Sequence, residues 1–307
     1  MLSSRRQQEI RACCDSVSFD VSMAAYSTFK AGGPAAALVN IQDLVQLSAL
    51  LEYCRSEEIP WRVIGRGSNI LVTDSGFNGI LFRLGGDFRT VQLENESEST
   101  IITAGGGCLL ADLLGWCRRN GLGGLEFLAG IPGGVGGAVR MNAGAFGHSI
   151  GEFLQVVSII GADGVVEEKK ADALILDYRC CTVEGYDLDQ AVILSVTLQL
   201  QEADGERVAK DMQNYMLQRK KNQPLASPSA GSFFKNPEGD YAGRLIEAAG
   251  LKGARVGGAM VSPVHANFII NDGGQATAAD ILELMHKVQE KVRKQTGIFL
   301  EPEVHIF

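Results

Sequence analysis

Apolar residues recur at the helical period in several segments, most clearly near the end of the chain. The apolar stripe of that segment consists of Ile281, Leu284, Met285, Val288 and Val292. Thr277 and Asp280 have the spacing of an N-terminal capping box, and Gly297 follows where a C-terminal cap belongs. The pattern therefore predicts a long helix between Thr277 and Gly297. Further helices are predicted over 43–58, 112–119, 207–221 and 241–249.

Short apolar runs separated by Gly, Asn and Asp predict strands joined by tight turns. These runs are 62–64, 70–72, 80–84, 101–103, 154–160, 165–168, 192–200 and 267–271. Helices and strands occur in both halves without a fixed repeat, which indicates the α+β class. A polar break over 202–206 suggests a domain boundary. We therefore expect an N-terminal arm or short helix over 1–19, one domain over 20–203 and a second over 204–307.

Composition excludes several function classes. The 307 residues carry a net charge of −8, which argues against a nucleic-acid-binding surface. No run reaches the roughly 20 apolar residues that span a bilayer, and the first residues lack a secretory signal, so we expect a cytoplasmic protein without a membrane partner. The seven cysteines include no Cys-x-x-Cys, and no His pair has metal-ligand spacing. Reduced thiols and no metal site are the expectation.

Glycine makes up 37 residues, about 12% against roughly 7% in average proteins. The stretch 130–145 is rich in Gly and Ala, with apolar anchors that a flexible linker would lack. It is typical of a rigid surface that lets a cofactor approach the backbone. A second element, Gly65–Asn69, offers N–H groups to a phosphate or forms a plain tight turn. Two such elements suit an elongated ligand with a diphosphate in its middle, whereas a third run, 104–107, has close packing as its simpler interpretation.

Four polar residues are candidates for chemistry, and each has an ordinary alternative. Ser232, between small residues and two aromatics, is either a hydroxyl in a cleft or a loop serine near a helix cap. Arg179 is either a carboxylate clamp or a partner in a surface ion pair. Glu303 is a site carboxylate or a solvated one, and His265 a ligand or a satisfied loop histidine.

Taken in order, the motifs of this chain resemble the UDP-N-acetylenolpyruvoylglucosamine reductases, also called UDP-N-acetylmuramate dehydrogenases or MurB proteins. The matching segments are Thr28–Ala35, Gly65-x-Gly67-Ser68-Asn69, 121–137 with its Gly-Ile-Pro-Gly core, Met141–Ala145, Tyr178-Arg179, Gly231–Pro237, Ala248–Gly253, His265–Phe268 and Leu300–Val304. The resemblance implies a vanillyl-alcohol-oxidase-type FAD domain of two α+β subdomains and a C-terminal α+β domain that binds a UDP-sugar. No additional segment follows Tyr178, so the chain resembles the shorter branch, which lacks an inserted tyrosine loop.

The resemblance also implies an activity: reduction of UDP-N-acetylglucosamine enolpyruvate to UDP-N-acetylmuramate in peptidoglycan precursor synthesis. Non-covalent FAD would pass a hydride from NADPH to the outer alkene carbon. Ser232 would give a proton to the inner carbon, while Arg179 and a protonated Glu303 would stabilise the enolate-like intermediate. Such donors are commonly worth about 3–4 kcal/mol each. We expect a monomer.

The resemblance assigns further residues to the two ligands. The flavin contacts implied are Gly65, Gly67, Ser68, Asn69, Gly130, Ile131, Pro132, Gly133, Gly136, Gly137, Ala138, Asn142, Gly144 and Ala145. Tyr178, Asn236 and His265 are implied for the substrate. Cys181 and His305 depart from the family pattern, in which Ser and Arg are common. The alternatives are another FAD oxidoreductase, such as an alcohol or aldehyde oxidase, and a non-catalytic nucleotide- or sugar-binding protein.

Overall fold

The computed structural model describes residues 2–94 and 100–307, and its chain divides into two compact units. Unit 1 comprises Met1–Phe19, Ala37–Gly65 and Gly79–Leu217, whereas unit 2 comprises Asp20–Ala36, Arg66–Asn78 and Gln218–Phe307. Both units are therefore discontinuous in sequence. Helices and strands are mixed in each, which confirms the α+β class, while the domain limits at 19/20 and 203/204 stay predictions.

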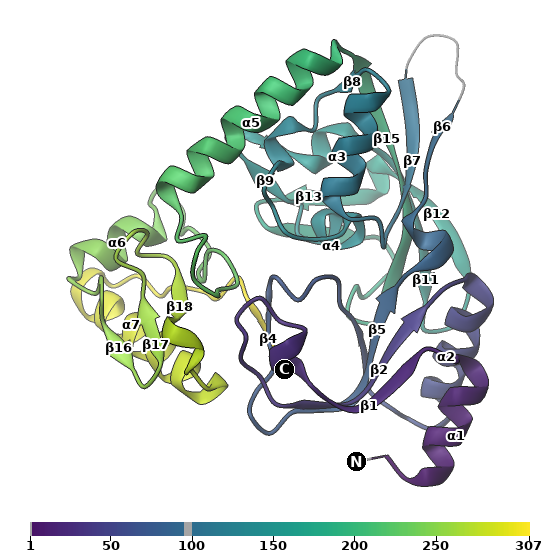
Figure 1. The fold of residues 1–307 in the computed structure, drawn as a ribbon, viewed down its shortest axis with the longest axis horizontal. Helices are drawn as coiled ribbons and strands as arrows, with labels where there is room; N and C mark the ends of the chain where they lie inside the picture. The colour runs from purple at the N-terminus through teal and green to yellow at the C-terminus, as the bar shows by residue number, and fades with distance from the viewer. Residues whose placement is uncertain (1, 95–99) are drawn as a thin grey trace. The chain divides into compact units, whose positions relative to one another are not determined.

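The first sheet has the strand order β1-β2-β5-β3 and lies largely in unit 1 (Figure 1). Its strands and neighbouring helices are α1 (Ser4–Cys13), β1 (Val17–Ser22), β2 (Pro34–Ile41), α2 (Leu44–Ser56), β3 (Trp61–Val63) and β5 (Phe77–Leu84). The helix predicted over 43–58 is confirmed as α2, and residues 4–13 form a helix within the predicted arm. The two helices pack on each other, and Ile10, Leu47 and Phe82 share one buried core.

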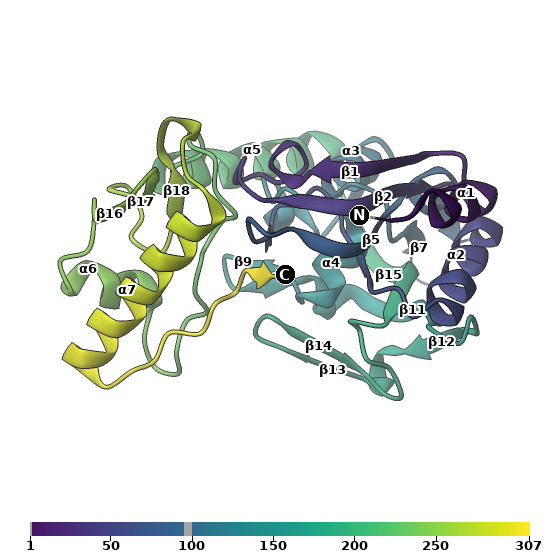
Figure 2. The ribbon, with the colours of Figure 1, turned by 90° about the horizontal axis from the view of Figure 1, so that it is seen from below.

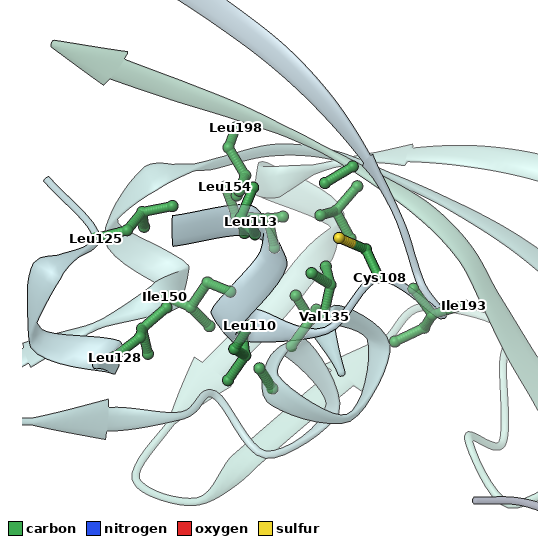
Figure 3. Packing of buried hydrophobic residues seen from close by; sticks show 14 of the residues in the cluster. Cys108, Leu110, Leu113, Leu125, Leu128, Val135, Ile150, Leu154, Ile193 and Leu198 are labelled. Atoms are coloured by element: carbon green, nitrogen blue, oxygen red, sulfur yellow. The ribbon is translucent and has the colours of Figure 1, made fainter. Parts of the chain in front are cut away.

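The second sheet of unit 1 is antiparallel, with the order β12-β11-β15-β7-β6 and β8 paired to β15. Its members are β6 (Val91–Glu94), β7 (Thr100–Gly105), β8 (Leu122–Gly123), β11 (Leu154–Gly161), β12 (Val166–Lys170) and β15 (Ala191–Glu202). Helix α3 (Leu110–Arg119) packs beside it, and Leu113, Val135 and Leu198 belong to its core (Figure 3). The strands predicted over 101–103, 154–160, 165–168 and 192–200 are thereby confirmed.

The run 104–107 packs against neighbouring backbone. A Cβ on Gly106 would lie 2.1 Å from the carbonyl oxygen of Ile193, and one on Gly105 would lie 2.1 Å from that of Phe88. Only glycine allows such an approach. The interpretation of this run as a packing element is confirmed.

The remaining elements of unit 1 lie within the glycine-rich stretch 130–145 or follow it. They are α4 (Val135–Arg140), β9 (Gly144–Ala145), β10 (His148–Ser149), β13 (Leu174–Asp177), β14 (Cys180–Val183) and, across the end of the unit, α5 (Gly205–Asn222). Strands β13 and β14 form an antiparallel hairpin closed by Tyr178 and Arg179 (Figure 2). Short 3-10 turns complete the chain: Met23–Ala25, Gly86–Arg89, Glu126–Leu128, Ile150–Phe153, Ala171–Ala173 and Asp272–Gly274.

Unit 2 contains a three-stranded sheet on which α7 packs, and α6 packs on α7. Its elements are β4 (Ile70–Leu71), α6 (Ala242–Ala248), β16 (Arg255–Val256), β17 (Ala259–Val261), β18 (Ile269–Asn271), α7 (Ala278–Thr296) and β19 (His305–Ile306). Helix α7 confirms the predicted long helix: Thr277 and Asp280 form the capping box, and Gly297 has a left-handed φ of 78°. The apolar stripe of α7 is buried in the core of this unit.

Segments from the first third of the chain are fastened to the rest of unit 2. Asp74 accepts hydrogen bonds from the N–H groups of Ala278 and Ala279 at 2.9 and 2.8 Å, which caps α7 from a distant loop. The buried Asn271 side chain donates to the carbonyl of Phe29 at 2.9 Å. These bonds hold residues 20–36 and 66–78 to the C-terminal part.

All seven cysteines are free thiols. Burial raises the pKa of Cys54 and Cys117 to about 12, so these thiols are unreactive at neutral pH. Within residues 2–94 and 100–307, no group of three or more His, Cys, Asp and Glu could hold a metal ion. No described helix is both long and apolar enough to cross a membrane.

Candidate active site

The glycine-rich stretch 130–145 is bonded along residues 106–110. Val135 and Gly136 donate their N–H groups to the carbonyls of Cys108 and Gly106, both at 2.9 Å, and Leu110 donates to Gly133 at 3.0 Å. The short helix α4 starts at Val135, inside a stretch that was predicted only as a surface. Backbone hydrogen bonds therefore hold residues 133–136 of this stretch to residues 106–110.

Backbone donors in this region are available to an anionic ligand. In the part of the chain that the structure describes, the N–H groups of Gly65, Gly133 and Gly137 donate to no other residue. A Cβ on Gly137 would meet no atom within 4 Å, and one on Gly65 would meet only the nitrogen of Gly134, at 3.7 Å. An open surface with unused N–H groups fits the diphosphate of FAD.

Other predicted flavin residues face the protein. A Cβ on Gly67, which has a φ of 66°, would lie 2.0 Å from the carbonyl oxygen of Tyr26. Gly136 uses its N–H internally, and Ala138 and Asn142 are buried. Gly130 and Pro132 are exposed, whereas Ile131, Ser68, Gly144 and Ala145 are partly exposed. The sequence motif thus combines residues open to a ligand with residues that shape the loop.

In unit 2, Ser232 and Glu303 lie on paired segments. The N–H of Glu303 donates to the carbonyl of Phe233 at 2.8 Å, and Lys235 donates to Glu301 at 2.9 Å. The side chain of Asn69 donates to the carbonyl of Glu303 at 3.1 Å, and β19 pairs in parallel with β4 next to it. The segments of Ser232 and Glu303 are therefore paired through their backbones, and the side chain of Asn69 is bonded to the Glu303 carbonyl.

A polar clamp fixes the segment that carries Ser232. The Asn267 side chain accepts from the N–H of Phe234 at 3.0 Å and donates to its carbonyl at 2.8 Å, as a neighbouring strand would. Phe233 and Phe234 are buried beneath it. Sequence reasoning did not find this role for Asn267, because a polar residue before an apolar run looks like a ligand-facing group. Only the tertiary pairing distinguishes the two roles.

His265 and Asn236 lie near the same clamp. The Nδ1 atom of His265 accepts from the N–H of Asn267 at 3.2 Å, so its neutral ring carries the proton on Nε2. Burial, and then the positive charge of Lys252, hold the pKa of His265 below its usual value. Asn236 accepts from the N–H of Ala242 at 3.1 Å at the start of α6.

In unit 1, Arg179 occupies the second position of the hairpin turn, with a left-handed φ of 54°. A non-glycine residue in this conformation is uncommon and is often found at functional sites. Its Nη1 donates to the carbonyl of Gly144 at 3.3 Å, its Nε is buried, and its guanidinium lies 5.2 Å from the Tyr178 ring centroid. The arginine is thus fixed at several points.

The two departures from the family pattern lie in different surroundings. Cys181 is buried in the core of unit 1, where burial raises its pKa to about 11. It therefore fills space as an uncharged side chain. His305 is exposed, and its N–H donates to the carbonyl of Asn69 at 3.0 Å.

Comparison with known proteins identifies the family. Residues 35–169 match an FAD-binding domain, and residues 223–307 match the C-terminal domain of UDP-N-acetylenolpyruvoylglucosamine reductase. A reductase of this name, number 2 from Symbiobacterium thermophilum, is 42% identical over 92% of this chain and 89% of its own. This chain belongs to the UDP-N-acetylenolpyruvoylglucosamine reductase family.

Further members of the reductase family support this assignment. The Bacillus subtilis reductase is 40% identical over 92% of this chain and 91% of its own length. The crystal structure of the Thermus caldophilus reductase superimposes with a TM-score of 0.79 at 39% identity, covering 94% of this chain and 97% of that one. The predicted family, an FAD-dependent oxidoreductase with a separate C-terminal domain, is confirmed.

Proposed function

We propose that this protein reduces the enolpyruvyl ether of UDP-N-acetylglucosamine to UDP-N-acetylmuramate for peptidoglycan synthesis. NADPH is the proposed electron donor, and we propose a cytoplasmic monomer. Relatives that carry the reductase name at about 40% identity over nine-tenths of the chain support this activity. The observation that carries the proposal is the backbone pairing of the Ser232 and Glu303 segments, because both residues were predicted for one reaction centre.

The glycine-rich elements hold the cofactor in this proposal. When bound, FAD supplies two-electron transfer between the nicotinamide and the substrate alkene. The N–H groups of Gly65, Gly133 and Gly137 would hold its diphosphate, because they are unused within the described protein. Gly67 and Gly136 pack closely against the backbone of Tyr26 and Gly106, so we propose that they shape the loops rather than contact the cofactor.

Arg179 binds the substrate carboxylate. Its guanidinium has five N–H donors in a fixed fork, which suits a carboxylate, and the contact with Gly144 orients that fork. The Tyr178 ring beside it restricts its rotation and is proposed to contact the substrate. A positive charge at the carboxylate favours the intermediate, in which negative charge spreads from the inner carbon into this group.

Ser232 and Glu303 handle the proton. The alkene gains a hydride at its outer carbon and a proton at its inner carbon. The Ser232 O–H bond breaks as the new C–H bond forms, and the alkoxide then recovers a proton from solvent. Glu303, in its protonated form, donates a hydrogen bond to the enolate-like oxygen, and its pairing with Phe233 keeps it beside Ser232.

His265 and Asn236 complete the proposed substrate site. His265 is held neutral at physiological pH, so Nε2 can donate one hydrogen bond to the UDP-sugar without adding a charge. Asn236, whose side-chain oxygen accepts from the N–H of Ala242 at the start of α6, is proposed to contact the sugar.

The test is an anaerobic visible spectrum of the purified protein. We expect a yellow protein that NADPH bleaches and that UDP-N-acetylglucosamine enolpyruvate restores, with UDP-N-acetylmuramate as the product by mass spectrometry. A colourless protein would refute the proposal. Recovery of the flavin colour by oxygen or by an aldehyde, with no recovery by the enolpyruvyl ether, would indicate an alcohol or aldehyde oxidase instead.

A further inference from the structure

Asn142 ends helix α4 in a conformation that usually requires glycine. Its φ is 38°, its N–H donates to Val139 at 2.9 Å, and the next N–H, of Ala143, donates to Ala138 at 2.7 Å. This bond pattern is a Schellman cap, in which glycine is the commonest residue at this place. An asparagine here suggests that the side chain has a function of its own.

The Asn142 side chain bridges two separate segments. Its Nδ2 donates to the carbonyl of Asp177 at 3.1 Å, and its Oδ1 accepts from the N–H of Gly151 at 3.1 Å. Asn142 is buried, with 9% of the residue exposed. Asp177 pairs with Cys180 to close the hairpin turn, so Asn142 fastens the residue directly before Tyr178 and Arg179.

The segment that contains Asn142 also binds the side chain of Arg179 directly. Gly144, two residues after Asn142, accepts from Nη1 of Arg179 at 3.3 Å. Residues 142–144 therefore bind both the base of the turn and the guanidinium at its tip. Loss of the Asn142 bridge would remove the bond that ties Asp177, at the base of the turn, to residues 142–144.

We propose that Asn142 is a positioning residue for Arg179: it fixes the hairpin turn so that the guanidinium meets the substrate carboxylate. This inference rests on the function proposed above and replaces the flavin contact that the sequence predicted for Asn142. Both polar atoms of its amide are engaged with backbone, which is the arrangement expected for support of a neighbouring loop.

The variant Asn142→Gly tests the role of the side chain without changing the backbone conformation at this position. Glycine accepts the left-handed conformation, so α4 keeps its cap while both bridging bonds disappear. We expect unchanged flavin content, unchanged KM for NADPH, and a KM for the enolpyruvyl substrate raised roughly fivefold to tenfold, the effect of about one hydrogen bond. Hydrogen exchange should become faster in 174–183.

Two further variants control the experiment. Asn142→Asp keeps the acceptor for Gly151 but loses the donor to Asp177, so it should show the same change in exchange over 174–183. Asn120→Ala removes another helix-terminal asparagine, bonded to Trp116 at 2.8 Å, and should leave the exchange of 174–183 and the substrate KM unchanged.

Loss of flavin from Asn142→Gly, with normal exchange of 174–183, would overturn the inference and restore the cofactor contact. Unchanged exchange with bound flavin would overturn it too. If the wild-type protein does not reduce the enolpyruvyl ether, the proposed function fails by itself. The exchange of 174–183 still decides whether Asn142 holds the turn.

Discussion

The residues proposed for the reaction are held by different physical means in the two units. In unit 2, Ser232 and Glu303 lie on segments joined by backbone hydrogen bonds above Phe233, which is fully buried. In unit 1, Arg179 lies in a two-residue turn with a left-handed backbone, beside a Tyr178 that is 47% exposed. The proton-handling residues thus depend on the core, whereas the arginine depends on a few side-chain bonds. Substitutions near Ser232 and Glu303 should therefore destabilise the protein, whereas substitutions near Arg179 should mainly weaken substrate binding.

The largest expected effect on stability is that of Phe233→Ala. This change removes a ring from the core of unit 2 and should lower the free energy of unfolding by about 3–5 kcal/mol. Tyr178→Ala is the matched change in the other region and should cost less than about 1 kcal/mol. Urea denaturation followed by circular dichroism measures both. Equal losses would contradict the contrast between the regions.

Arg179→Gly should lower kcat/KM for the enolpyruvyl substrate by roughly 10²–10³. Its effect on stability should stay below about 1 kcal/mol, because relief of the left-handed strain offsets the greater flexibility of glycine in the unfolded chain. Arg179→Lys keeps the charge without the planar fork and should give an intermediate loss of activity. A strong loss of stability in Arg179→Gly would show that the turn is structural.

The smallest expected effect concerns His265. Its pKa is lowered in the folded protein, so the unfolded chain takes up the proton first as the pH falls below about 6.5. The free energy of unfolding should therefore decrease between neutral pH and the lower folded pKa, and be restored above about 6.5. His265→Gln should reduce that decrease. An NMR titration that gave His265 a raised pKa would reverse the sign and contradict the prediction.

Elements with strong local signals could be predicted from the sequence. Helix α7 was predictable because Thr277, the apolar stripe and Gly297 all agree. Helix α4 was not, since glycine disfavours helices and the start of α4 depends on bonds from Val135 and Gly136 to distant carbonyls. The strands β13 and β14 were missed as well, although Tyr178 and Arg179 do lie in the short connection between them.

In the candidate site, too, local motifs could be predicted from the sequence, whereas roles that depend on distant contacts could not. The motif order identified the family and named Arg179, Ser232 and Glu303 as candidates, whose roles stay proposals. The supporting roles of Asn142, Asn69 and Asn267 could not be predicted, since each depends on a partner more than thirty residues away in the chain. An asparagine in a loop gives the same sequence signal whether it contacts a ligand or the backbone.

The most direct test of the account compares wild-type protein with Ser232→Ala in two separate anaerobic half-reactions. The account predicts that NADPH bleaches the flavin of both proteins at the same rate. It also predicts that the enolpyruvyl ether restores the wild-type colour but restores the variant roughly 10²–10⁴ times more slowly. Ser227→Ala, in the same loop, should behave as wild type. An equal slowing of both half-reactions in Ser232→Ala, or normal recovery, would contradict the role of Ser232 as the proton donor.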